Sequence, residues 1–358
     1  MPEMRVDERV IGDSHPTYFI ADIAANHDGD LARAVDLIHL AATSGADAAK
    51  FQHFRAVHIV SDYGFRALGS QQSHQSTWTK SVYDVYEAAS LPWEWTESLQ
   101  RACHDAGIHF FSAPYDAEAI EMLDRLGVPA FKMGSGDITW PAIVERMART
   151  GKPLFAATGA ADLGDVQRLM SAVRGYDIPI CLMQCNTNYT GSRENLRFVN
   201  LNVLRAFAVL YPDAVLGLSD HTPGDVTALG AVALGARVIE KHFTDDKRRE
   251  GPDHGFSMDP ADWRAMVERV RDLEAALGST DKHVEDNEKE TVVLQRRCLR
   301  AARDLPAGHV ITDDDVEALR PAPLDAIFPY DLPRIRGRAL ARPLARGEHL
   351  RFDDLARA

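Results

Sequence analysis

The chain is predicted to be an α/β protein, a (β/α)8 TIM barrel followed by a small β-rich domain. Over residues 1–277, eight short apolar segments with polar ends alternate with helical patterns. No Gly-x-Gly-x-x-Gly run follows the first segment, which argues against a dinucleotide-binding sheet. The pattern changes beyond a charged linker at residues 278–290. We therefore expect a barrel domain over residues 1–277 and a second domain over residues 291–358.

The barrel strands are expected where an apolar run, in most cases preceded by a glycine turn, ends in polar residues. The first strand covers residues 18–23, and helical patterns occupy residues 30–44 and 116–126, among others. The other expected strands are residues 45–52, 107–114, 127–135, 151–159, 178–186, 216–222 and 239–245. Eight strand–helix units favour a closed barrel over an open doubly wound sheet.

The second domain is expected to have internal pseudo-symmetry. Residues 305–316 are echoed by residues 344–355, at an offset of 39 residues. A domain of this size leaves little room for chemistry of its own. We therefore expect it to cover or complete the site of another subunit.

Composition excludes several classes of partner. The formal net charge of −13 argues against a nucleic-acid or anionic-membrane partner. Four scattered cysteines do not form a disulfide framework, and no apolar run is long enough to span a bilayer. The first residues contain no apolar leader segment, so the sequence predicts a cytoplasmic protein.

Two histidines stand at the ends of successive strands, His221 after Ser219 and His242 after Glu240. Residues two apart on a strand face the same way, and the carboxyl ends of barrel strands build the active site. Neutral imidazoles there can converge on one divalent metal ion. A single histidine at a strand end would more often satisfy a local hydrogen bond, but a pair favours the metal site.

Lys50 and Lys132 each interrupt an otherwise apolar strand. A buried unpaired ammonium group is costly, so each lysine must meet an anion. One interpretation is a pair of internal ion pairs, with Glu240 and Asp22 as partners. We favour phosphate binding, because the flexible backbone at residues 134–136 could direct N–H groups at phosphate oxygens.

Asp22 and Asp137 follow the first and fourth strands. Carboxylates at these positions can act as acid or base, or orient a metal-bound water. The alternative role is a helix N-cap, which is weaker for Asp22, because residues 24–29 separate it from the next helix.

Several runs together resemble the sialic acid synthase family, the nonulosonate synthases that condense phosphoenolpyruvate with an N-acylated aldose. The resemblance covers nearly the whole chain, and the second domain is similar to the family's antifreeze-like (SAF-type) domain. The runs are residues 132–136, 218–222, 241–245, 251–253 and 319–321. This combination implies a carbon–carbon bond-forming, phosphoenolpyruvate-dependent transferase that releases phosphate and a 2-keto-3-deoxy sugar acid.

The resemblance also implies roles for individual residues. His221 and His242 would hold a divalent ion, Mn²⁺ first and Mg²⁺ or Co²⁺ as alternatives, with Asp22 and Asp137 as catalytic carboxylates. The expected phosphoenolpyruvate ligands are Lys50, Lys132, Ser135, Ser219 and one of Asn186, Thr187 and Asn188, of which we take Asn186. The expected sugar ligands are Gln52, Tyr189, Asp253 and Arg320. Arg320 would reach a partner subunit's barrel, which implies a domain-swapped homodimer.

The sequence departs from the family at several strand ends. The family usually has Glu where this chain has Asp22 and Asp137, which shortens each carboxylate by about 1.5 Å. Ala113 and Ala157 stand where the family commonly has hydroxyl residues, and the loop at residues 186–191 lacks the usual Asn-x-Tyr-Pro pattern. We infer a divergent branch with an altered sugar.

Two other functions are compatible with the sequence. A barrel aldolase or synthase acting on a phosphorylated sugar would need a second cationic cluster, for which only Arg55 and Arg66 are candidates. A non-catalytic sugar-binding homologue would not be expected to keep both histidines and both lysines. The polar segment at residues 61–83 could line the sugar pocket or form a solvated loop; its polar residues include Gln71, Gln72, His74 and Gln75.

Overall fold

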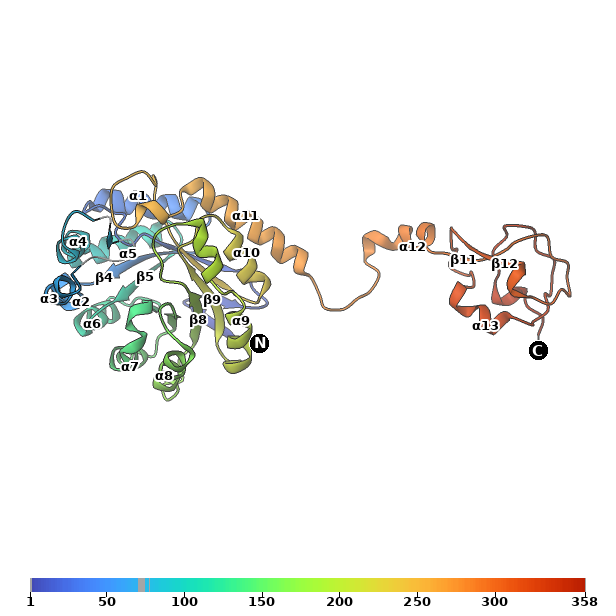
Figure 1. The fold of residues 1–358 in the computed structure, drawn as a ribbon, viewed down its shortest axis with the longest axis horizontal. Helices are drawn as coiled ribbons and strands as arrows, with labels where there is room; N and C mark the ends of the chain where they lie inside the picture. Colours follow the sequence, from blue (N-terminus) through green and yellow to red (C-terminus); the bar gives the residue numbers. More distant parts are fainter. Residues whose placement is uncertain (1, 70–74, 77, 358) are drawn as a thin grey trace. The chain divides into compact units, whose positions relative to one another are not determined.

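The computed structural model describes residues 2–69, 75–76 and 78–357. The chain divides into two compact units, Met1–Gly278 and Ser279–Ala358. In the first unit, helices surround a central sheet, while the second contains short strands and turns (Figure 1).

The first unit is the expected barrel. Its eight strands are parallel and follow the hydrogen-bonded order β5-β4-β3-β10-β9-β8-β7-β6. The two end strands, β5 and β6, also lie side by side, which closes the ring. All eight expected strands are confirmed, as β3 (Tyr18–Asp22), β4 (Ala48–His53), β5 (His109–Pro114), β6 (Phe131–Met133), β7 (Leu154–Ala157), β8 (Ile180–Cys185), β9 (Val215–Asp220) and β10 (Val238–His242).

Helices connect the strands and bury their apolar faces against the outside of the sheet. Asp30 begins the first of them by accepting hydrogen bonds from the backbone of Ala32 and Arg33. The connecting helices are α1 (Leu31–Thr43), α5 (Thr96–Asp105), α6 (Ala117–Arg125), α7 (Pro141–Ala148), α8 (Leu163–Val173), α9 (Val203–Leu210), α10 (Val226–Ala233) and α11 (Pro260–Leu277). The long β4–β5 connection adds α2 (Ala56–Ile59), α3 (Asp62–Ala67) and α4 (Val82–Ala89).

An N-terminal hairpin fills the end of the barrel opposite the carboxyl ends of the strands. This hairpin was not predicted from the sequence. It consists of the antiparallel strands β1 (Glu3–Val6) and β2 (Arg9–Gly12). Met4, Val6 and Ile11 pack with the inward-facing apolar residues of the barrel strands. The barrel is therefore closed by apolar side chains at the end opposite the strand carboxyl ends.

The second unit has the expected pseudo-symmetry down to individual contacts. Leu305 and Leu344, equivalent in the repeat, exchange backbone hydrogen bonds of 2.9 Å in both directions. Arg303 pairs with buried Asp315, and the equivalent Arg342 pairs with buried Asp354, each at 2.6 Å. The regular elements are α12 (Lys289–Gln295), β11 (Cys298–Ala301), β12 (Val316–Leu319) and α13 (Leu332–Ile335).

The expected linker, residues 278–290, is solvent-exposed in the structure. It includes the short 3-10 helix η6 (Asp286–Glu288) and leads into α12. Among the residues that the structure describes, no helix combines the length and the apolar character needed to cross a membrane.

Candidate active site

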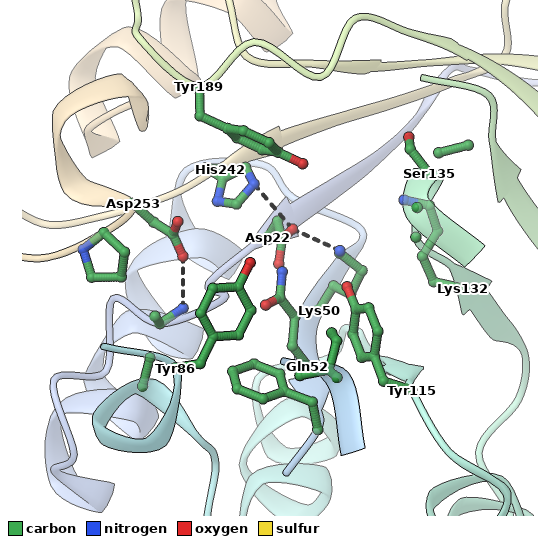
Figure 2. Close-up of a pocket in the computed structure, with 18 of the residues that line it drawn as sticks. Asp22, Lys50, Gln52, Tyr86, Tyr115, Lys132, Ser135, Tyr189, His242 and Asp253 are labelled. Carbon is green, nitrogen blue, oxygen red and sulfur yellow. Dashed lines mark hydrogen bonds and ion pairs between the residues drawn. The ribbon is translucent and has the colours of Figure 1, made fainter. Parts of the chain in front are cut away.

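A cavity of about 420 Å³ lies at the carboxyl ends of the barrel strands. Figure 2 shows side chains from several strands and loops converging in it. Eleven of the residues expected at the site line this cavity, namely Asp22, Lys50, Gln52, Lys132, Ser135, Asp137, Tyr189, Ser219, His221, His242 and Asp253.

The strand register brings the charged residues together. In the parallel pairing, Asp22 lies opposite Lys50 on β4 and opposite His242 on β10. Lys50 Nζ lies 2.6 Å from Asp22 Oδ2 and 3.4 Å from Glu240 Oε1. Lys132 Nζ donates to the same Glu240 oxygen at 2.7 Å. Both lysines are thus held in internal ion pairs, the alternative left open by the sequence, while they still line the cavity.

The ion pairs favour the charged forms of Glu240 and Lys50 despite their burial, whereas for Asp22 burial outweighs Lys50 and raises the pKa. Burial would raise the pKa of Glu240, but the ammonium groups of Lys132 and Lys50 outweigh it and lower the pKa to about 2. Burial would likewise lower the pKa of Lys50, but the carboxylates of Asp22 and Glu240 raise it above its ordinary value. Two ammonium groups therefore face the cavity beside two carboxylates.

The two histidines are neutral neighbours, with ring centroids 5.3 Å apart. Burial lowers the pKa of each ring to about 3. His221 Nδ1 lies 2.9 Å from the carbonyl oxygen of Asn186, which can only accept a hydrogen bond. Nδ1 must therefore carry the proton, which leaves Nε2 of His221 as an unprotonated nitrogen.

These histidines fit a divalent metal ion as a partial ligand set. His242 Nδ1 is buried and has no hydrogen-bond partner among the described residues, while its Nε2 lies 3.4 Å from Asp22 Oδ2. The described residues contain no group of three or more His, Cys, Asp or Glu side chains arranged to hold a metal. Protein ligands would thus supply two imidazole nitrogens, and water or substrate oxygens would complete the coordination.

Asp137 is not a helix N-cap. It lies within the 3-10 helix η3 (Ser135–Thr139), and the following helix α7 is preceded by Trp140 without a side-chain cap. Its Oδ2 is buried and finds no partner in the described part of the chain. Burial raises its pKa to about 6, so this carboxyl can change protonation state close to neutral pH. Asp22 does not cap a helix either, since Asp30 caps α1.

The serine hydroxyls are positioned by close backbone approaches. The N–H of Gly159 donates to Ser135 Oγ at 3.0 Å. A Cβ atom at Gly159 would come within 2.5 Å of Thr187 and 2.8 Å of Ser135 Oγ, so glycine is required there. Ser219 Oγ donates to Glu240 Oε1 at 3.1 Å, which joins it to the central ion cluster.

Asp253 lies on a fixed loop after β10. Its Oδ2 accepts a hydrogen bond of 3.1 Å from the N–H of Ala25 (Figure 2). The adjacent His254 is buried between Thr244 Oγ1, at 2.7 Å, and Asp28 Oδ1, at 2.8 Å. Burial raises the pKa of Asp253 to about 7. The loop therefore presents a carboxyl group that titrates near neutral pH.

The alternate residues of β9 and β10 point away from the cavity and hold the two strands together. Lys241 forms a buried ion pair with Asp220, its partner in the strand register. Lys241 Nζ also donates to the carbonyl oxygen of Thr222 at 2.7 Å, and Thr227 Oγ1 donates to Asp220 at 2.7 Å. This pair fixes the strands that carry His221 and His242.

Two expected site residues do not lie in the cavity. Asn186 is not among the described residues that line it; its side-chain Nδ2 donates to the carbonyl of Phe198 at 3.3 Å. Its contribution is instead the backbone carbonyl that orients His221. Arg320 is exposed in the second unit, directly after β12. Of the polar loop residues considered for the sugar pocket, Gln71, Gln72 and His74 lie outside the described residues.

Several residues that line the cavity were not expected from the sequence. Glu240 was considered only as an ion-pair partner, although it lies two residues before His242 and faces the same way. The aromatic residues were missed because they come from the β4–β5 connection and from the end of β5, where periodicity predicts no inward direction. They are Phe54, Trp78, Tyr86 and Tyr115.

Family models match both units of the chain. The model of the NeuB family matches residues 37–282, and the model of the SAF domain matches residues 296–356. The chain belongs to the NeuB family. The barrel and the small C-terminal domain are thus the two parts expected from the sequence motifs.

Several relatives of this NeuB-family chain are named as sugar-acid synthases. N,N'-diacetyllegionaminic acid synthase of Legionella pneumophila is 35% identical over 349 residues, 96% of each chain. Human N-acetylneuraminate-9-phosphate synthase is 32% identical over 306 residues, 86% of this chain and 84% of the relative. The crystal structure of N-acetylneuraminic acid synthetase from Leptospira borgpetersenii has a TM-score of 0.71 and 26% identity, covering 81% of this chain and 95% of that one. The predicted resemblance to the sialic acid synthase family, and the enzyme class with it, is confirmed.

Breaking the Lys132–Glu240 pair should destabilise the barrel. Lys132→Met leaves a buried carboxylate short of one partner, so we expect the free energy of unfolding to fall by about 3–5 kcal/mol. The double variant Lys132→Met/Glu240→Gln should recover most of this loss. Urea unfolding followed by tryptophan fluorescence reports on the barrel, because all five tryptophans lie in the first unit.

The matched control for this cycle is Lys152→Met, which removes a partly exposed pair with Asp124. Its loss should stay below about 1 kcal/mol. Equal losses from Lys132→Met and Lys152→Met, or additive losses in the double variant, would contradict a coupled buried pair.

The carboxyl group of Asp253 should make stability depend on pH. Its pKa is about 7 in the folded chain and about 3.8 when unfolded, so the folded state binds more protons between these values. The free energy of unfolding should therefore fall as the pH rises from about 4 to 7. Asp253→Asn should gain stability relative to the wild type at pH 8 more than at pH 5. A pH-independent difference, measured by urea unfolding, would show that Asp253 does not titrate in this range.

Proposed function

We propose that this enzyme condenses phosphoenolpyruvate with an unphosphorylated N-acyl aldose to give a 2-keto-3-deoxy sugar acid and phosphate. The observation that carries the proposal is the convergence of Lys50 and Lys132 with two neutral histidines in one cavity. The family relationship supports the same reaction class.

The lysines suit the carboxylate and phosphate groups of phosphoenolpyruvate. In the structure, each ammonium group is already shared with a carboxylate, and it can extend further hydrogen bonds to a ligand, since an ammonium group has three donors. Ser135 and Ser219 would add hydroxyl donors beside them. Phosphoenolpyruvate would thus lie at the end of the cavity near β6.

Charge balance favours an additional cation in the loaded site. The described lining residues contain two ammonium groups, Lys50 and Lys132, against the carboxyl groups of Asp22, Asp137, Glu240 and Asp253. An anionic substrate would be repelled by this excess of carboxylates unless protons or a metal ion offset it. We propose that His221 and His242 bind Mn²⁺, or Mg²⁺ or Co²⁺ in its place. Such an ion would polarise the aldehyde oxygen of the sugar.

The proposed reaction forms one carbon–carbon bond and one carbon–oxygen bond to water, and it breaks the carbon–oxygen bond to phosphate. C3 of phosphoenolpyruvate attacks the aldehyde carbon, and the aldehyde oxygen takes up a proton. Water adds at C2, and phosphate leaves with its bridging oxygen as the new C2 hydroxyl group becomes the ketone. Of the two protons that this water loses, one balances the proton taken up by the aldehyde oxygen and the other leaves with the phosphate. Asp137, with a pKa of about 6, suits the proton acceptor, and Asp22 would orient the reacting groups next to Lys50.

An unphosphorylated sugar is favoured by the partners of the two candidate arginines. Arg55 pairs with Asp116 and Glu118, and Arg66 pairs with Asp62. Neither arginine lines the cavity in the described structure. The second cationic cluster that a phosphosugar would need is therefore not supplied by these residues.

We also propose that the second unit completes the site of a partner subunit in a homodimer. Arg320 is exposed, and the described residues show no hydrogen bond or ion pair to its side chain. Its planar guanidinium group could donate two hydrogen bonds to the carbonyl of a sugar's acyl group, which a lysine could not reproduce. The exposed segment at residues 278–290 would give this unit the necessary reach.

Phosphate release should require phosphoenolpyruvate, an N-acyl aldose and a divalent ion together. Chelator-treated protein should be inactive and should recover with Mn²⁺. His221→Ala and His242→Ala should each lower kcat/KM by more than about a hundredfold, since residues that merely orient metal ligands contribute 10- to 100-fold. Mn²⁺ binding, followed by electron paramagnetic resonance, should weaken in parallel. Exposed His39→Ala is the control, and wild-type metal binding by both active-site variants would contradict the assignment.

Mixed dimers should test the role of Arg320. Arg320→Ala and His221→Ala chains are each expected to be inactive alone. If sites form across subunits, a mixed dimer contains one intact site out of two. Its activity should then be about half that of a wild-type dimer. Verified mixed dimers without activity, or a monomeric wild-type protein with full activity, would contradict completion by a partner.

A further inference from the structure

A tyrosine at the end of β5 gives the cavity a hydroxyl group that the reaction proposed above does not use. Tyr115 directly follows β5 and lines the cavity. Its backbone N–H donates to the carbonyl oxygen of His53 at 3.0 Å, which continues the pairing of β5 with β4. Figure 2 shows the hydroxyl group directed into the cavity, on the side of Lys50. The strand pairing thus fixes the backbone from which this side chain reaches the reaction centre.

The ring of Tyr115 is held by an aromatic residue and a glycine. The ring of buried Phe54 meets it edge to face, with centroids 5.9 Å apart. A Cβ atom at Gly134 would lie 2.9 Å from Tyr115 Oη and 3.4 Å from two carbon atoms of its ring. The φ angle of Gly134 is −67°, which any residue can adopt, so glycine is needed there for space. The hydroxyl group therefore lies close against the backbone at Gly134.

This hydroxyl group is a donor without an acceptor in the protein. Among the residues that the structure describes, none forms a hydrogen bond with Tyr115 Oη. Burial, together with the carboxylates of Asp137 and Asp22, raises the pKa of Tyr115 well above its ordinary value. The group therefore keeps its proton at neutral pH. Because an unpaired polar group in a largely buried place is costly, we expect its acceptor to be a ligand of the cavity.

The hydroxyl group lies beside the segment that carries two of the expected phosphoenolpyruvate ligands. Gly134, next to Tyr115 Oη, stands between Lys132 and Ser135 in the sequence. The residue at the end of β7 is Ala157, which lines the cavity but has no side-chain donor. Both lysines of the cavity already share their ammonium groups with carboxylates. A neutral donor at this place would therefore strengthen the binding of an anion without adding a further buried charge.

We propose that Tyr115 is a further substrate-binding residue, whose hydroxyl group donates a hydrogen bond to an anionic oxygen of phosphoenolpyruvate. This inference rests on the proposed condensation reaction. The competing acceptor is a hydroxyl group of the sugar. A phosphate or carboxylate oxygen is the stronger acceptor, because it is charged. The position of Tyr115 Oη beside Gly134, directly before Ser135, also favours the anion.

Tyr115→Phe tests the proposal, because it removes the hydroxyl group and keeps the ring. With Mn²⁺ and an N-acyl aldose at saturation, the KM for phosphoenolpyruvate should rise about 10- to 100-fold, as expected for a lost hydrogen bond to a charged group. The KM for the sugar should stay unchanged. The free energy of unfolding should not fall, since no described residue bonds this hydroxyl group. An unchanged KM for phosphoenolpyruvate, or a rise confined to the KM for the sugar, would overturn the proposal.

Tyr211→Phe is the matched control. The Tyr211 hydroxyl group is also buried and has no hydrogen-bond partner among the described residues. Tyr211 lies between α9 and β9, outside the cavity. Its variant should change the free energy of unfolding as little as Tyr115→Phe does, and it should leave the KM for phosphoenolpyruvate at the wild-type value. An equal rise of this KM in both variants would overturn a direct contact with Tyr115.

Binding measurements separate this inference from the reaction on which it rests. The Kd of phosphoenolpyruvate is measured by calorimetry in the presence of Mn²⁺ and without a sugar, for the wild type, Tyr115→Phe and Tyr211→Phe. If no sugar supports phosphate release, the proposed condensation fails, but weaker binding by Tyr115→Phe alone would still support the contact. Equal Kd values for all three proteins would overturn this inference and leave the proposed reaction intact.

Discussion

The buried ion cluster at the centre of the barrel is the constraint on which the site depends. Asp22, Lys50, Lys132 and Glu240 place two negative and two positive charges where little water can solvate them. Each charge is tolerable because the strand register supplies an opposite charge within hydrogen-bonding distance. The cluster also keeps His242 neutral, since the nearby ammonium groups and burial both disfavour a further positive charge. The shortened carboxylate of Asp22 contacts both Lys50 and His242, so it is already engaged at its present length.

Much of the fold could be predicted because the barrel repeats one local pattern. Each strand buries both faces, so its apolar run is visible in the sequence. Because side chains alternate along a strand, the residues that face inward can then be assigned. The repeat of the second unit was visible for a similar reason, since equivalent residues such as Asp315 and Asp354 perform the same local task. The N-terminal hairpin was missed because its two four-residue strands have no buried run of that kind. Their packing partners lie on distant strands.

The site was predictable where it lies on strands and unpredictable where it lies on connections. The alternation of side chains along a strand predicts the inward direction of Lys50, Gln52, Ser219 and His221, because the backbone fixes that direction. No such rule applies to the β4–β5 connection, which supplies Phe54, Trp78 and Tyr86 to the cavity. Asn186 shows the opposite limit: the residue was singled out for its side chain, while the fold uses its backbone carbonyl.

The N-terminal hairpin, which fills the end of the barrel opposite the strand carboxyl ends, affects how substrates and products enter and leave the cavity. Met4, Val6 and Ile11 occupy the space through which small molecules could otherwise leave downward. Substrates and products then exchange with solvent at the carboxyl ends of the barrel strands. Asp253 is half-buried there, whereas Lys132 is fully buried. For the reaction proposed here, the phosphate-bearing substrate has to enter before the sugar covers it. Inorganic phosphate, formed at the deeper end, has to wait for the sugar acid to depart. For the proposed reaction, closure of this end of the barrel would favour binding of phosphoenolpyruvate before the sugar.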